Sequence, residues 1–417
     1  MNFNQTFKRI ICAVLASGML MSVCACGGSM SKSTVNMMDG IRADSTKTGM
    51  SPNGEFIGGY ADFAIDLFRQ SAGDGKNTTI SPLSVMLALA MTANGAEGET
   101  LAQMEKALGG MDIDSLNKYL SYYVENLPSS QKSKITLANS VWFRDDKNRL
   151  NVKDKFLKTN ANYYNADAYS APFDSGTLKD INNWVSKNTD GRIKEMLDKI
   201  PADAVMYLIN ALTFDAEWLQ PYMKDDVSNG EFNGADGKQK VEMMNSCESS
   251  YIDDGKATGF IKPYADGYSF VAMLPNEGVS IEEYIASMNG EKFVESVKNA
   301  EYGMVFTALP KFTTEYSAEL SSALKAMGMT NAFDYENADF SGIDDKNYLF
   351  IGRVLHKTYI SVNERGTKAG AATAVEMRDG AGLTETKYVT LDRPFVYAII
   401  DDETSLPVFI GRVMNVK

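Results

Sequence analysis

Histidine and cysteine are scarce in this chain of 417 residues. His356 is the only histidine. The four cysteines are Cys12, Cys24, Cys26 and Cys247, and three of them fall within the first 26 residues. A disulfide framework needs several paired cysteines, and a zinc site needs three or four clustered Cys, His or carboxylate ligands. The sequence therefore predicts no metal site and no cofactor, and a hydrolytic triad would have to use His356.

Positive charge is also in short supply. The formal net charge is −13, and no dense cluster of Lys or Arg interrupts the acidic excess. Nucleic-acid binding depends on such clusters, so nucleic acid is not an expected partner. The 44% of hydrophobic and 23% of charged residues are typical of a globular protein with a large core.

The long apolar runs expected of membrane spans are missing, apart from one run at the amino terminus. Lys8 and Arg9 precede an apolar segment from Ile10 to Val23. That length suits the core of a signal peptide and is short for a bilayer-spanning helix. We expect residues 1–25 to be a signal peptide outside the fold.

The end of this segment resembles a bacterial lipoprotein box, in which small residues precede a cysteine that becomes lipidated. Cys26, between Ala25 and Gly27, fits best, and Cys24 is the second candidate. The alternative is an ordinary cleaved signal. Lipidation predicts a protein anchored in a bacterial cell envelope, facing the surface or the periplasm. Residues 26–53, rich in Ser, Gly, Thr, Met and Lys, are expected to form a flexible tether.

Residues 54–417 mix helical and strand patterns without βαβ regularity, which indicates one α+β domain. Helical spacing covers 54–72, 82–95, 181–197 and 318–327. Strand patterns cover 135–143, 205–214, 269–274, 304–308, 356–362, 389–390, 395–400 and 408–413. Ser81 and Pro82 form a capping signal ahead of a helix that is apolar nearly all round and therefore buried.

Short motifs in this region resemble those of the serpin family, in the family's order. They are ISPLS (80–84), GAEGET (95–100), NNWV (182–185), GRI (191–193), NALTF (210–214), LPKF (309–312), ADFSG (338–342), VNERGT (362–367), RPF (393–395) and GRV (411–413). The resemblance implies the serpin fold: three β-sheets, about eight or nine helices and an exposed reactive loop over about 364–392. It also implies a metastable native state whose largest sheet can accept that loop as a new strand.

The resemblance also assigns roles to buried polar residues. Ser81, Ser84, Asn210 and His356 match a hydrogen-bonded cluster beneath the opening sheet. Trp218 matches a tryptophan near the point of loop insertion. Lys311 and Glu364 match an ion pair at the base of the loop.

The loop itself carries a pattern that needs no family knowledge. No proline occurs between Gly366 and Pro394, so every residue there can donate to a β-ladder. One alternating set holds Thr367, Ala369, Ala371, Thr373, Val375 and Met377, all apolar or threonine. The other holds Lys368, Gly370, Ala372, Ala374, Glu376 and Arg378, with all three charges. Because strand side chains alternate faces, the first set suits the interior and the second suits solvent.

These features predict an inhibitor rather than an enzyme. A serine or cysteine protease would attack the loop as a suicide substrate and remain covalently attached while the loop inserts. The protein is expected to act as a monomer. Three bonds remain candidates for attack: Gly380–Ala381, Leu383–Thr384 and Arg378–Asp379. They suit elastase-like, chymotrypsin- or subtilisin-like, and trypsin-like specificity respectively.

Two alternatives remain. A non-inhibitory serpin would act as a binding or carrier protein, although the small residues of the loop hinge favour inhibition. A hydrolase would use Ser81 or Ser84 with His356, but both serines have apolar surroundings and neither lies in a nucleophile-elbow motif.

Overall fold

A computed structural model describes residues 30–44, 48–73, 75–145, 150–346, 349–367 and 385–416. The chain divides into two units, Met1–Met30 and Ser31–Lys417, and the second is the folded domain. The predicted signal peptide and Cys26 lie outside the described residues.

Nine α-helices occur among the described residues. They are α1 (Gly54–Ser71), α2 (Pro82–Ala93), α3 (Gly98–Ala107), α4 (Ile113–Asn126), α5 (Asp154–Tyr164), α6 (Ser175–Asn188), α7 (Ile281–Ser287), α8 (Gly290–Lys298) and α9 (Ser321–Ala326), with short 3-10 helices η1 (Lys224–Asp226) and η2 (Asn331–Phe333). The predicted start of α2 is confirmed: Oγ of Ser81 accepts a hydrogen bond from the Ser84 amide at 3.2 Å, and Pro82 opens the helix. Every residue of α2 is buried.

The first sheet has seven strands. All of them except β11 pair with at least one strand that is not the next or the previous strand in the sequence. Its order is β1 (Val35–Asn36), β4 (Asp167–Ala171), β3 (Ser133–Arg144), β5 (Met206–Glu217), β13 (Gly366–Thr367), β12 (Arg353–Asn363) and β11 (Phe312–Glu319). The β5–β12 pair is parallel and the β3–β5 pair is antiparallel.

The remaining strands form a connected set of nine. Its order is β14 (Lys387–Thr390), β10 (Glu301–Pro310), β7 (Gly237–Asp253), β8 (Ala257–Pro263), β9 (Tyr268–Pro275), β15 (Phe395–Asp401), β16 (Pro407–Val413) and β2 (Thr78–Ile80), with β6 (Val227–Gly234) also on β7. The long strand β7 pairs with β6 and β10 along most of its length and with β8 only at its end. It thus joins two sheets, which makes three in all and confirms the predicted α+β fold.

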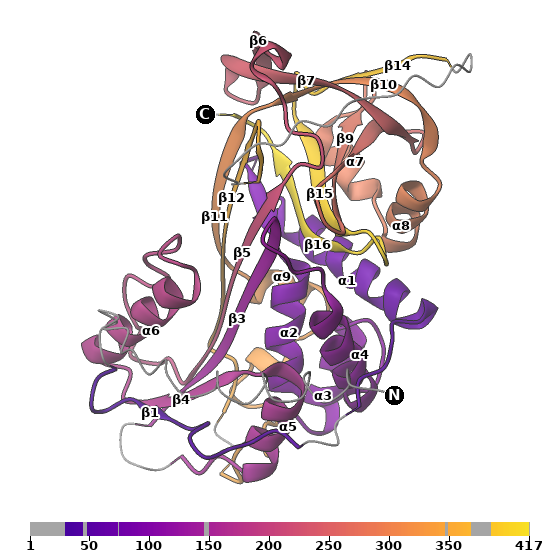
Figure 1. Ribbon diagram of the computed structural model, residues 1–417. Coiled ribbons are helices and arrows are strands. Elements are labelled where there is room, and N and C mark those ends of the chain that lie inside the picture. The colour runs from indigo at the N-terminus through magenta and orange to yellow at the C-terminus, as the bar shows by residue number, and fades with distance from the viewer. Residues whose placement is uncertain are drawn as a thin grey trace, which may run out of the picture. The chain divides into compact units, whose positions relative to one another are not determined.

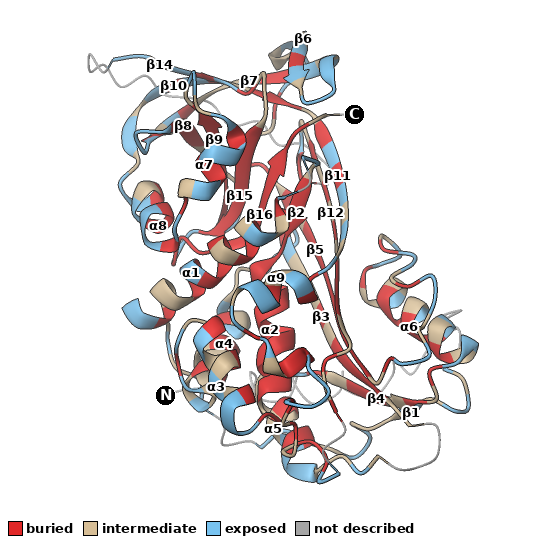
Figure 2. Ribbon diagram, turned by 180° about the vertical axis from the view of Figure 1, so that it is seen from behind, coloured by how far each residue is buried: buried red, intermediate tan, exposed pale blue. Residues whose placement is uncertain are grey.

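Helices cover both faces of the seven-stranded sheet (Figures 1 and 2). On one face α2 packs against alternate residues of β5, including Leu208 and Leu212, in the main core. On the other face Trp184 of α6 packs with Tyr207 and Ile209 in a second, smaller core. Because β5 alternates between two apolar layers, it is buried on both sides, as its continuous apolar sequence predicts.

Two helix boundaries differ from the sequence prediction. The helix expected to reach residue 197 ends at Asn188, because Asp190 and Gly191 adopt left-handed conformations with φ of 51° and 74°. The helix expected over 318–327 begins only at Ser321, since β11 continues through Glu319 and keeps its pairing with β12. Local helical spacing was outweighed there by strand pairing.

Part of the segment predicted as a flexible tether over residues 26–53 makes contacts with the domain. Val35 and Asn36 pair with the edge strand β4 as β1. The Asp180 carboxylate on α6 accepts hydrogen bonds from the Ser31 amide and from the Thr34 hydroxyl, the latter at 2.6 Å. These polar partners come from distant parts of the chain, so local composition did not reveal them. None of the helices in the described ranges has the length and apolar character needed to cross a bilayer.

Candidate functional site

The seam between β5 and β12 is the structural feature that the loop prediction concerns. The two strands pair directly from Tyr207 opposite Arg353 to Thr213 opposite Tyr359. Beyond that stretch the strand β13 lies between them, antiparallel to both. Two residues near the start of the predicted loop, Gly366 and Thr367, therefore already pair as a short strand between β5 and β12.

Gly366 makes this entry possible. Its φ of 143° lies in a region that residues with a side chain rarely adopt, and a Cβ at this position would stand only 2.0 Å from the Ala216 carbonyl oxygen. The absent side chain lets the β13 backbone approach β5 closely. A glycine is therefore required where the loop enters the sheet.

Thr367 faces the interior, as the alternating pattern predicts. It is 1% exposed, and its Oγ1 lies 2.7 Å from Oη of Tyr264, the residue after β8. The Tyr264 ring stacks on Trp218, with centroids 4.3 Å apart and planes at 9°. Burial raises the pKa of the Tyr264 hydroxyl, which therefore stays protonated and available as a hydrogen-bond partner.

The turn before β13 is fixed to the segment that follows β5. Trp218 donates from Nε1 to the Asn363 carbonyl at 2.8 Å and from its amide to the Arg365 carbonyl at 2.9 Å. The Tyr222 amide donates to the Glu364 carbonyl at 2.9 Å. Trp218 thus lies beside the residues at which the predicted loop enters the sheet, the position that the family resemblance implies.

Lys311 and Glu364 form the ion pair expected at the base of the loop, with Nζ and Oε2 3.0 Å apart. A second carboxylate, that of Glu242, lies 3.3 Å from the same ammonium group. Partial burial acts against the charge, but the two carboxylates raise the pKa of Lys311 above its usual value. The Glu364 backbone amide and Lys311 together lower the pKa of the Glu364 carboxyl.

Three of the four predicted cluster residues share hydrogen bonds around His356. Nδ1 of His356 bonds to Oδ1 of Asn210 on the facing strand, and Nε2 accepts from the Ser81 backbone amide at 3.1 Å. This arrangement requires the neutral ring with its proton on Nδ1. Burial lowers the pKa of His356 to about 3, in agreement with that tautomer.

The remaining polar atoms of this cluster are left without partners. Ser84 contributes its backbone amide to the Ser81 hydroxyl, but the Ser84 Oγ is buried and unpaired, and so is Nδ2 of Asn210. His356 meets the Ser81 amide rather than either serine hydroxyl. The geometry therefore does not assemble the nucleophile–base pair of the hydrolase alternative.

The sequence did not reveal a buried ion pair beside the loop entry. Nζ of Lys262 on β8 lies 2.7 Å from Oε1 of Glu248 on β7, with side chains 2% and 8% exposed. The same ammonium group lies 4.3 Å from the Tyr222 ring centroid and 5.4 Å from that of Trp218. Charged residues are normally assigned to the surface, so no sequence signal singled out this pair.

The predicted reactive bonds and most of the loop lie outside the described residues. These are Lys368, Ala369, Gly370, Ala371, Ala372 and Thr373 of the hinge, and the candidate residues Arg378, Asp379, Gly380, Ala381, Leu383 and Thr384. Their assignments remain predictions from the sequence.

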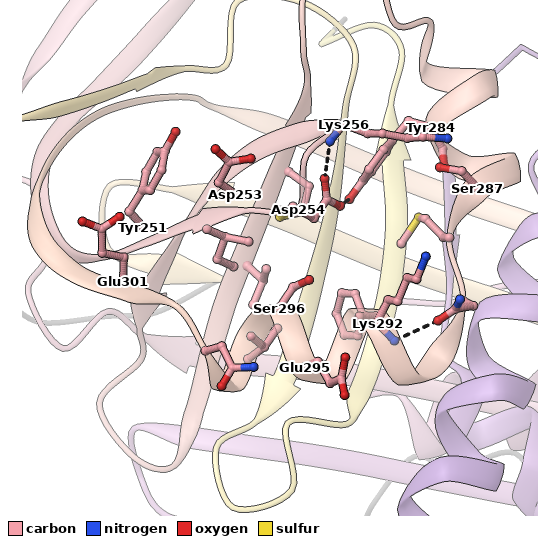
Figure 3. A pocket seen from close by; sticks show the side chains of 18 residues that line it. Tyr251, Asp253, Asp254, Lys256, Tyr284, Ser287, Lys292, Glu295, Ser296 and Glu301 are labelled. Carbon is pink, nitrogen blue, oxygen red and sulfur yellow. Dashed lines mark hydrogen bonds between the residues drawn. The ribbon is translucent and has the colours of Figure 1, made fainter.

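A pocket of about 510 Å³ lies away from this seam, between α7–α8 and the strands β7 and β9. Figure 3 shows Tyr284 directed at Asp254, to which its hydroxyl donates at 2.8 Å. The charged side chains of Lys256, Lys292 and Glu295 also line the pocket. None of its lining residues belongs to β5, β12 or β13. No group of three or more potential metal ligands occurs among the described residues.

Comparison with known proteins agrees with this geometry. Residues 59–416 match the family model described as serpin, a serine protease inhibitor. The chain is 31% identical over 373 residues to leukocyte elastase inhibitor A of Mus musculus, covering 85% of this chain and 97% of that protein.

Solved structures give the same result. The native state of tengpin, a thermophilic serpin, is 50% identical, with a TM-score of 0.87 over 92% of this chain and 99% of that one. The latent state of tengpin has a TM-score of 0.79 at 48% identity, over 89% and 100% of the two chains. The match to the family model and these likenesses cover most of the domain, and the chain belongs to the serpin family.

Proposed function

We propose that this protein inhibits serine or cysteine proteases as a suicide substrate, through insertion of its reactive loop between β5 and β12. The observation that carries the proposal is β13. Gly366 and Thr367 already pair with both flanking strands, so further insertion extends a strand that exists. The likeness to an elastase inhibitor supports the same conclusion.

Extending the register of β13 shows where each loop residue would go. Thr367 lies opposite Ala216 on β5 and opposite Val362 on β12. Six residues further, Thr373 would lie between Asn210 and His356. Its hydroxyl would meet the unpaired Nδ2 of Asn210 as the Asn210–His356 contact separates. The small residues of this alternating set would enter the interior, and the charged set would face the α6 side.

The same register relates the position of the reactive bond to the end of the sheet. Met377 would lie opposite Met206, the first residue of β5. All three candidate bonds follow Met377: Arg378–Asp379, Gly380–Ala381 and Leu383–Thr384. Insertion through Met377 would therefore carry an attached protease to the far end of the sheet whichever of these bonds is cut.

The proposed chemistry is acyl transfer that stops halfway. The protease nucleophile attacks the carbonyl carbon of the bait bond, the C–N bond breaks, and the new amine leaves with a proton from the protease's general acid. The chain amino-terminal to the cut then inserts while still bound as an ester or thioester. Deformation of the protease's oxyanion hole prevents water from completing hydrolysis.

The free energy for this deformation comes from the sheet. A central strand adds roughly a dozen hydrogen bonds, each contributing about 0.5–1.5 kcal/mol net. The gain is on the order of 10 kcal/mol, comparable with the stability of a whole domain. The serpin acts as a substrate with stored free energy and contributes no catalytic group of its own.

We also propose that residues 1–25 direct export and that Cys26 carries the lipid, which places the inhibitor on the bacterial envelope. Mass spectrometry of the native protein tests this directly. A diacylglyceryl modification on Cys26 is the expected result. Modification of Cys24, or an unmodified amino terminus after a different cleavage, would contradict it.

The inhibitor proposal is tested by mixing the purified protein with trypsin, pancreatic and neutrophil elastases, chymotrypsin, subtilisin and papain. Denaturing gels should show a complex that survives boiling, and the mass of the released carboxy-terminal fragment identifies the bond. Cleavage by these proteases without a stable complex, and without a rise in melting temperature, would instead support the non-inhibitory binding or carrier function.

A further inference from the structure

Large apolar side chains stand exposed on two neighbouring strands at the edge of a sheet. Tyr302, Met304 and Phe306 of β10 are 82%, 48% and 42% exposed, and Tyr388 of β14 is 72% exposed. We call these four residues the aromatic patch. The strands that carry them lie at the opposite end of the molecule from α3 and α5 (Figures 1 and 2).

The patch is an organised surface. Phe306 and Tyr388 are directly opposite each other in the parallel β10–β14 pairing, and their rings stack with centroids 5.6 Å apart. The residues that precede or follow them, Val305 and Val389, are buried beneath the sheet. At this pair the two strands thus use one face for the core and present aromatic rings on the other, whereas Tyr302 lies beyond a register shift in the pairing of β10 with β7. Single exposed apolar side chains are common on protein surfaces, but a group of neighbouring ones often marks an interaction site.

The position of the patch points to the partner. Glu385 is the first described residue after the gap at 368–384, and β14 begins two residues later. From Leu383 to Tyr388 is five residues, which an extended chain spans in at most roughly 17 Å, and from Arg378 in at most roughly 35 Å. A protease–inhibitor interface covers roughly 800 Å² on each partner, so a protease bound at any candidate bond extends towards these strands.

We propose that the aromatic patch is a docking surface for the target protease beside the reactive loop, an inference that rests on the proposed inhibitory function. The partner surface is apolar and is flanked by basic groups, since the exposed carboxylates of Glu301 and Glu385 border the patch. Lys387 repels basic groups on the partner only weakly, because its ammonium lies 3.0 Å from the Glu385 carboxylate and over the Tyr251 ring.

Docking on this surface affects only the first, non-covalent association of protease and inhibitor. After the bait bond is cut, the carboxy-terminal side of the loop remains attached to β14, while the protease leaves with the inserting segment. Contacts with the patch must therefore break before trapping is complete. The patch raises the rate of association without stabilising the final complex.

The test replaces three patch residues together: Met304→Ser, Phe306→Thr and Tyr388→Thr. Threonine retains the strand preference of the aromatic residues it replaces. The matched control is Tyr335→Thr, which removes another aromatic ring, 63% exposed. Tyr335 follows η2, and the amides of Thr330, just before η2, and of Asn331, its first residue, donate to Gln103 of α3 at the other end of the molecule.

The measured quantity is the second-order rate constant for loop cleavage or trapping by a protease of the panel that attacks the wild-type loop. The triple variant should react about ten-fold more slowly, whereas Tyr335→Thr should react at the wild-type rate. The melting temperature and the number of inhibitor molecules consumed per protease should not rise or fall with the triple substitution, because sheet insertion is unaffected.

Each other outcome overturns the docking surface, the inhibitory function or both, and the outcomes are distinguishable. An unchanged rate in the triple variant refutes the docking surface and leaves the inhibitory function intact. A wild-type dimer that the triple variant loses, with equal protease rates, assigns the patch to a second copy through the β14 edge. A slower loop cleavage in the triple variant without any trapping refutes inhibition and retains the docking surface. Failure of every protease to attack the wild-type loop refutes both.

Discussion

Asn210 and His356 lie opposite each other on parallel strands, and their side chains share a hydrogen bond across the seam at which loop insertion is proposed. The two residues are 146 positions apart in the chain, and both are completely buried. Insertion of a strand between β5 and β12 separates them. In the proposed mechanism this bond therefore holds the native sheet closed, and its loss would accompany insertion of the loop.

Replacement of His356 by leucine should destabilise the native state. The substitution leaves the Ser81 amide and Oδ1 of Asn210 buried without a partner, and such groups cost about 1–3 kcal/mol each. We expect a lower denaturation midpoint and faster spontaneous loss of inhibitory activity on warming. Urea unfolding and timed activity assays measure the two effects.

A matched control is Thr313→Val. Oγ1 of Thr313 lies 2.9 Å from Oγ of Ser361, in an exposed pair that joins β11 to β12 and does not cross the seam. Loss of this exposed bond should change stability by no more than about 0.5 kcal/mol. Equal losses in the two variants would show that the His356 bond has no special role in closing the sheet.

The same histidine predicts a dependence of stability on pH. The unfolded chain binds a proton at His356 below about pH 6.5, whereas the folded protein keeps the ring neutral until about pH 3. The group therefore does not change stability above about pH 6.5, and it lowers stability by roughly 1.4 kcal/mol per unit as the pH falls from there towards 3.

Melting temperatures of the wild type and of His356→Leu, measured from pH 7 to pH 4, test this sign. The leucine variant lacks the titrating group, so its deficit relative to the wild type should shrink on acidification. Parallel curves for the two proteins would contradict the prediction.

Gly366 and Gly58 form a contrasting pair of glycines. Gly366→Ala should weaken β13, because the new Cβ overlaps the Ala216 carbonyl and the backbone has a positive φ. We expect a loss of about 1–2 kcal/mol from the backbone strain alone, together with a larger fraction of loops cut without trapping. Gly58→Ala lies in α1 with open space around the new methyl group, so it should stabilise by about 0.5–1 kcal/mol. Urea unfolding and the trapped fraction on gels distinguish the two, and similar behaviour would contradict the argument.

The sequence predicted those parts of the site whose residues bear a local signature. The capping serine before α2, the Lys311–Glu364 pair and the inward orientation of Thr367 were all expected, and the structure places them accordingly. The first followed from capping chemistry and the second from motif resemblance. The third followed from the period of two that any strand must obey.

What could not be predicted depends on partners that only the folded chain brings together. Asp180 gives residues 31–34 fixed hydrogen-bond acceptors, so a segment with the composition of a linker is ordered against α6 and β4. Lys262 and Glu248 looked like surface charges, because their mutual contact exists only once β7 and β8 pair and aromatic rings close over them. Composition and periodicity describe residues close together in the chain, so they do not predict contacts between distant segments.

The loop alternation can be tested on two adjacent alanines. Ala371 belongs to the set that should enter the interior, where the extended register places it opposite Leu212, and Ala372 belongs to the solvent-facing set. Ala371→Arg should bury an unpaired charge on insertion and turn the inhibitor into a substrate that is cut without trapping. Ala372→Arg should retain trapping. Equal trapping by both variants would mean that the loop does not insert in this register.

Lys262 and Glu248 form a buried ion pair beside the residues at which the loop enters the sheet. A double-mutant cycle measures how much each of the two charges contributes to stability. Lys262→Met alone leaves the Glu248 carboxylate buried with no cation, which should cost about 3–5 kcal/mol. Adding Glu248→Met removes that charge as well, and it should recover most of the loss, because apolar side chains of similar length can replace a buried pair. Because Lys262 also lies over the rings of Tyr222 and Trp218, the single variant should loosen the turn that Trp218 holds and speed spontaneous loop insertion. Urea unfolding and the rate of activity loss report the two effects. A double variant no more stable than Lys262→Met would show that the cation stabilises the entry through the aromatic rings rather than through Glu248.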